Sequence, residues 1–175
     1  MGLIQVSTST ITGIPNSVTL DGINTDDVYV LVASGLTITV DTAYLHFRVT
    51  KDVGGTTTTQ TASQYCYTNK ILKAEASIEN FALADRNTMY FANTPIGSQA
   101  GESSNIIYTL FNFNNSSEYS FITVEENIFS STNNTTRGSQ GALVYKVTEA
   151  HNGITITGDA CNLNGGTLTL YKQVL

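Results

Sequence analysis

Apolar and polar residues alternate along much of the chain, and alternation with a period of two is typical of β-strands that bury one face. The clearest case is residues 43–50, where Leu45, Phe47 and Val49 share one face and His46 and Arg48 occupy the other. Residues 28–32 form an unbroken apolar run, which predicts a strand buried on both faces. Further strands are expected at residues 3–12, 105–113, 118–129, 154–157 and 167–171.

Residues that favour tight turns separate these segments. They are Asp21-Gly22, Gly54-Gly55, residues 114–117, Asn133-Asn134, Asn152-Gly153 and Gly165-Gly166. Residues 71–83 are the ambiguous stretch: their Ala and Glu content suits a short helix. Ser77 and Asn80 interrupt this stretch and no cap is evident, which favours a strand or an irregular crossing. About ten strands predict an all-β, antiparallel β-sandwich, jelly-roll-like, forming one domain over residues 1–175 with both termini in the sheets.

The composition agrees with a globular β domain and excludes several other classes. The 175 residues are 41% apolar, which is enough for a core, and only 13% charged. Thr, Asn and Ser number 27, 16 and 15, while the 14 Gly show no triplet repeat. Because apolar segments continue to the end of the chain, a disordered tail is excluded, as are coiled-coil and collagen-like structures.

The charge narrows the range of partners. Eight Lys and Arg against 14 Asp and Glu give a net charge of −6, with a pI of about 4.7, and the basic residues are scattered. Nucleic acids and anionic membranes attract clustered Lys and Arg, so neither is expected as a partner. No signal peptide is recognisable at residues 1–10 and no stretch reaches 18 apolar residues, so synthesis in a cytoplasm without membrane insertion is expected.

Cysteines and tyrosines are interpreted as packing residues. Cys66 and Cys161 are expected to be small core residues, because a disulfide between them would need an oxidising compartment that nothing else indicates. The nine Tyr lie in or near predicted strands. Aromatic residues in strands belong more often to a core or a subunit interface than to a carbohydrate platform.

The sequence contains no recognisable catalytic or metal-binding motif. His46 is expected to point outward from its strand, and His151 is expected to be a loop residue beside the Asn152-Gly153 turn. The His and Cys residues lack the spacing of a zinc site, and nucleophile-elbow, P-loop and dinucleotide motifs do not occur. We therefore expect no cofactor and no enzymatic activity, although composition alone leaves a Ser-His-Asp arrangement open.

The acidic pairs are weak candidates for chemistry. Glu125 and Glu126 are neighbours on a predicted strand, so they should point to opposite faces and cannot flank one glycosidic bond. Asp26 and Asp27 are expected in a solvated turn; a calcium site is the alternative, without EF-hand spacing. Four Asn-x-Ser/Thr sequons are interpreted as polar turns, since no secretion signal accompanies them; they begin at Asn114, Asn115, Asn133 and Asn134.

Four strings carry a family resemblance. They are TDDVYVLV at residues 25–32, LHFRVTK at 45–51, LFNFNNSSEYSF at 110–121 and GTLTLYK at 166–172. In this order they resemble a family of small virion structural proteins of tailed phages, cyanophages especially. The resemblance covers residues 18–172, and residues 110–121 are its most specific part.

The resemblance implies a non-enzymatic component of the phage particle, made in the bacterial host. A single module without heptads or solenoid repeats favours a capsid decoration (cement or knob) protein; the alternative is a tail or fibre-tip module that binds a host-surface glycan or receptor. The implied partners are copies of the chain itself, most simply in a trimer, and the major capsid protein or tail and fibre proteins. The low surface charge suits such packing. For host binding, the candidate contacts are Asn112, Asn114, Asn115, Ser116, Tyr119, Asn133, Asn134 and Arg137.

Overall fold

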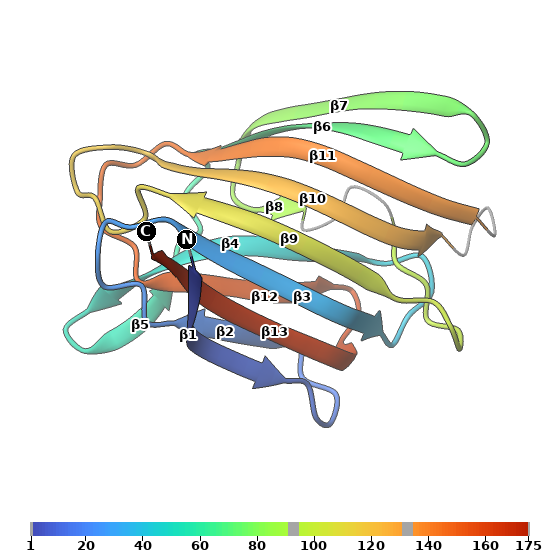
Figure 1. The fold of residues 1–175 in the computed structure, drawn as a ribbon, viewed down its shortest axis with the longest axis horizontal. Helices are drawn as coiled ribbons and strands as arrows, with labels where there is room; N and C mark the ends of the chain where they lie inside the picture. Colours follow the sequence, from blue (N-terminus) through green and yellow to red (C-terminus); the bar gives the residue numbers. More distant parts are fainter. Residues whose placement is uncertain (1, 91–94, 131–134, 175) are drawn as a thin grey trace.

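Two antiparallel sheets form the fold of the computed structural model, which describes residues 2–90, 95–130 and 135–174 (Figure 1). The larger sheet has the strand order β1 (Gly2–Thr10), β13 (Leu163–Val174), β3 (Tyr29–Ile38), β9 (Ser104–Phe111), β10 (Ser120–Ser130), β11 (Thr135–Tyr145), β6 (Tyr65–Lys73), β7 (Ser77–Arg86). The smaller sheet has the order β2 (Ser17–Asp21), β12 (Gly153–Asp159), β4 (Tyr44–Val53), β5 (Thr56–Thr59), with β8 (Met89–Tyr90) beside β4.

These thirteen strands, with no helix among the described residues, confirm the prediction of an all-β, antiparallel fold. The predicted number of about ten strands was too low, and a jelly-roll connectivity stays a prediction. Within the same described part of the chain, no helix is long and apolar enough to span a membrane.

The core lies between the inner faces of the two sheets. Leu31 and Tyr108 of the larger sheet and Phe47 and Ile156 of the smaller sheet are at most 1% exposed and belong to one apolar cluster. The rings of Phe47 and Tyr108 meet across the layers, with their centroids 5.1 Å apart. The alternation predicted in residues 43–50 is therefore confirmed, because it buries one face of β4 against the larger sheet.

Strand β3 corrects the prediction that residues 28–32 are buried on both faces. Tyr29 and Leu31 are fully buried, whereas Val30 and Val32 lie on the outer face and are only half-buried. The outer face of the larger sheet is thus apolar here although the smaller sheet does not cover it. An unbroken apolar run cannot distinguish a strand between two layers from one whose solvent face is also apolar.

Two further segments test the turn signals. Residues 71–83 form the end of β6, a turn and the start of β7, so the strand interpretation is confirmed and the helix is excluded. Gly165-Gly166 was predicted as a turn but lies within β13, where the register with β3 shifts on both sides of Gly165. The positive φ of Gly166 (109°) accommodates this β-bulge, which uses glycine for the same reason that turns do.

The two termini are both in the larger sheet, as predicted. Strand β1 pairs with β13, with Gly2 opposite Val174. Figure 1 shows the two ends side by side at one edge of the sheet, with β7 at the opposite edge.

Candidate functional site

The outer face of the larger sheet is the most extensive surface that lacks a covering layer. Strand register places its side chains in rows that run across β9, β10, β11, β6 and β7. One such row consists of Thr109, Thr123, Ala142, Thr68 and Ala82. Antiparallel sheets usually carry polar and charged side chains on their solvated face, so this uncharged row is unusual.

Charge is sparse on this face. In the four rows that the register defines on these five strands, Glu125 and Lys70 are the charged residues, and both lie in one row on either side of Gln140. The rows contain 19 described residues: Phe111, Phe121, Val144, Cys66; Thr109, Thr123, Ala142, Thr68, Ala82; Ile107, Glu125, Gln140, Lys70, Asn80; and Asn105, Asn127, Gly138, Leu72, Ile78. We call this set the outer face.

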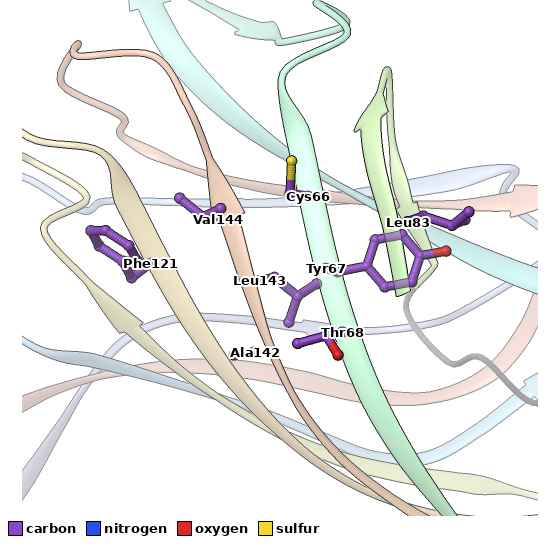
Figure 2. Close-up of a pocket in the computed structure, with 8 residues that line it drawn as sticks. All are labelled: Cys66, Tyr67, Thr68, Leu83, Phe121, Ala142, Leu143 and Val144. Carbon is purple, nitrogen blue, oxygen red and sulfur yellow. The ribbon is translucent and has the colours of Figure 1, made fainter. Parts of the chain in front are cut away.

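An apolar groove of about 340 Å³ crosses the outer face between β10 and β6 (Figure 2). Its walls include Phe121 on one side and Cys66 and Thr68 on the other, with Ala142 and Val144 on the strand between. Phe121 is 46% exposed, which is a large solvent contact for an aromatic side chain. Covering this apolar groove with a partner would therefore lower the free energy, because it removes apolar area from water.

The groove also corrects one expectation about the cysteines. Both thiols are free, and Cys161 is buried in the core as predicted. Cys66 is not a core residue, because it lies on the outer face of β6, between the inward-facing Tyr65 and Tyr67. Tyr65 and Tyr67 are among five Tyr residues in the core cluster, which agrees with the core part of the expectation that strand tyrosines belong to a core or a subunit interface.

The predicted contact loop at residues 112–119 is held by hydrogen bonds within the chain. Asn112, which has a positive φ of 59°, donates to Glu118 (Nδ2···Oε2, 2.5 Å). Asn114 and Asn115 donate to the Ile23 carbonyl (3.4 Å) and to Asp26 Oδ2 (2.9 Å). The amides expected to bind a ligand are thus engaged with the protein, while Ser116 and Tyr119 remain exposed; Tyr119 lines a shallow hollow beside Phe121.

The second group of predicted contacts is described only in part, because Asn133 and Asn134 lie outside the described residues. Arg137 was expected in a loop but belongs to β11, where its side chain is 12% exposed and its Nη2 lies 4.0 Å from Glu75 Oε1.

The acidic residues have partners inside the protein. Asp27 forms an ion pair with Lys172 (2.5 Å), whose hydrogen bond lowers the pKa of Asp27. Asp26 accepts from Asn115 as described above. In residues 2–90, 95–130 and 135–174, no group of three or more His, Cys, Asp or Glu side chains is placed to hold a metal ion. Glu125 and Glu126 lie on opposite faces of β10, as predicted.

Three polar residues lie in the order of a Ser-His-acid catalytic triad, but they are not accessible to a substrate. Ser120 Oγ is 2.8 Å from His151 Nδ1, and His151 Nε2 is 3.3 Å from Glu149 Oε1. His151 lies in a loop, as predicted, but it is fully buried, as is Ser120. Because a nucleophile must reach its substrate, this Ser-His-Glu series is interpreted as a structural network.

A polar cleft of about 280 Å³ opens at the side of the sandwich, between β4–β8 and β6–β7. Tyr90 packs against His46 (centroids 5.2 Å apart), while Arg86, Asn87 and Thr88 supply polar groups along the rim. His46 points away from the core as predicted, and burial beneath Tyr90 lowers its pKa. The sequence offered no signal for this cleft, because its walls come from separate strands of two sheets.

Comparison with known proteins adds no relationship. No protein-family model matches the chain, and no curated protein matches it.

Proposed function

We propose that this chain is a non-enzymatic structural protein of a tailed-phage particle, and specifically a capsid decoration protein on the head surface. The observation that carries the proposal is the outer face: a broad sheet surface with two charged side chains, exposed apolar side chains and an apolar groove. Such a surface is costly to leave in water, so it suits a protein whose working state is assembled.

The family resemblance is the reason for assigning the chain to a phage particle. The fold is a compact module, which is suited to cementing neighbouring capsid subunits. Its partners would be copies of itself and the major capsid protein.

Immunogold electron microscopy of intact particles tests the location. Gold over the head is expected, together with loss of heat or chaotrope resistance in particles that lack the protein. Gold restricted to the tail would contradict decoration, and absence of the protein from virions by mass spectrometry would contradict any virion role.

We infer a second candidate, a tail or fibre-tip module that binds a host-surface glycan, from the polar cleft. Rings of Tyr90 and His46 beside Arg86 and Asn87 combine an apolar stacking surface with hydrogen-bond donors, as sugar-binding sites do. The Arg48 Nε donates to the Asn87 carbonyl (3.1 Å) and so holds the rim.

Binding of the purified chain to host cells, measured by competition with infection, tests this candidate. Tyr90→Ala should abolish competition, and Tyr119→Ala, in the loop at residues 112–119, is the matched control. Loss with Tyr119→Ala alone would assign binding to the loop instead of the cleft.

A further inference from the structure

We infer that the outer face pairs with the outer face of a second copy of the chain, with the twofold axis running along β11. This inference rests on the proposed function, because it names the partner of the surface that carries it. The axis exchanges β10 with β6 and β9 with β7, since these strands lie on either side of β11.

Charge complementarity identifies a second copy of the chain as the partner that covers the outer face. Glu125 and Lys70 lie in one row, each one strand away from β11, with Gln140 between them. Rotation about β11 therefore brings Glu125 of one copy opposite Lys70 of the other, twice in the pair. The chain has a net charge of −6, so contacts between copies elsewhere would bring like charges together, whereas this face is neutral and complementary to itself.

The shapes of the side chains on the outer face fit the same twofold axis. Phe121 on β10 and Cys66 on β6 also lie in one row, each one strand away from Val144 on β11. The same rotation places the exposed Phe121 ring of each copy against the Cys66 side of the other copy's groove. Two small residues, Ala142 and Gly138, lie on the axis strand itself and allow close approach.

The area is sufficient for a stable pair. Five strands spaced about 4.8 Å apart and four rows spaced about 6.7 Å apart cover roughly 600 Å² per copy. The pair would bury about 1,200 Å² in total, which exceeds the roughly 1,000 Å² expected of a specific interface. A closed trimer needs two different surfaces on each copy, whereas a face complementary to itself joins copies two at a time.

The mass of the purified chain in solution, measured by light scattering or sedimentation, tests the pairing. Wild type is expected at two chains, or at an even multiple where another contact adds to this one. Glu125→Lys and Lys70→Glu should each weaken pairing by about tenfold or more, because each places like charges opposite one another, and the double exchange should restore it. Asp21→Lys, at an exposed position of β2 in the smaller sheet, makes the same charge change as Glu125→Lys away from the face and should have no effect.

Two results would overturn the inference: a monomeric or odd-numbered wild type, or no rescue by the double exchange. If the chain is a monomer but is still detected on particles, the pairing is refuted and the proposed function is not. A dimer that is absent from virions refutes the proposed function alone.

Discussion

Two polar residues on the inner face of β10, Ser120 and Glu126, are buried in different ways although they share a strand and a face. They are six residues apart, or roughly 20 Å along the strand. Between them lie Ile122 and Val124, so the apolar alternation is interrupted at both places. The comparison shows what a polar group needs in order to occupy a core position.

At the Ser120 end, the loop at residues 148–152 supplies a partner for each polar atom. His151 bonds to Ser120 and Glu149, its backbone N–H donates to the Phe113 carbonyl (2.6 Å), and Lys51 neutralises Glu149 (2.5 Å). Burial lowers the pKa of His151, which is therefore neutral at neutral pH.

At the Glu126 end, Ser139 donates a hydrogen bond to the carboxyl group (2.9 Å), and the phenol of Tyr108 is near enough for Glu126 to raise its pKa. Burial raises the pKa of Glu126 to about 8, so the group is protonated at neutral pH. Other buried polar atoms of this inner face, Asn69 Oδ1 and Ser104 Oγ, have no hydrogen-bond partner within the described structure. A complete network allows polar groups in the core, whereas an incomplete one forces the carboxyl group to become neutral.

The largest expected effect on the free energy of unfolding is its pH dependence through Glu126. Between the usual pKa of 4.5 and the folded value of about 8, the folded state keeps a proton that the unfolded state loses. The free energy of unfolding should therefore fall by about 1.4 kcal/mol per pH unit as pH rises through this window. Urea unfolding of wild type and Glu126→Gln across the window measures it. Gln should abolish the decline attributed to this group, and Glu125→Gln on the outer face should keep it.

Removing the Ser120 hydroxyl should lower the free energy of unfolding by less than the full pH-dependent loss through Glu126. Ser120→Ala removes the partner of a buried imidazole nitrogen, and leaving such a group unsatisfied costs about 1–3 kcal/mol. Denaturant unfolding at neutral pH measures the cost, with the exposed Ser116→Ala as its control. An unchanged unfolding free energy would mean that the network does not stabilise this end of the core.

The acid response of His151 should have the opposite sign to that of Glu126. Because the folded pKa of His151 lies below the usual histidine value of 6.5, the unfolded state binds a proton first as pH falls. Stability should therefore decline below pH 6.5, and His151→Gln should reduce the decline, although His46 contributes in the same direction. An equal decline in His151→Gln and wild type would assign the effect to other groups.

The smallest effect on stability is expected on the other side of β10. Phe121→Ser changes an exposed position and should alter the free energy of unfolding of the monomer by about 0.5 kcal/mol or less. Unfolding at low protein concentration measures it. A loss of several kcal/mol would mean that Phe121 packs within its own chain and does not serve a partner.

The candidate surface was only partly predictable. The sequence showed a low charge suited to assembly, and it showed Tyr119 and Ser116 as exposed loop residues. It did not show that the asparagines at 112, 114 and 115 bond within the chain, or that Arg137 lies in β11, because those outcomes depend on Glu118, Ile23, Asp26 and the pairing of β10 with β11.

The sequence by itself determined the strands and their buried faces, because alternation and turn residues act over a few neighbouring positions. Thus residues 43–50 have the predicted face, and Glu125 and Glu126 point apart. The tertiary structure alone decided which faces are covered. Val32 and Cys66 are partly exposed because they face away from the five-stranded sheet, on the side of the larger sheet that no second layer of the described residues covers, and the burial of His151 depends on a loop closing over Ser120. Such contacts join residues far apart in the chain, so no local pattern encodes them.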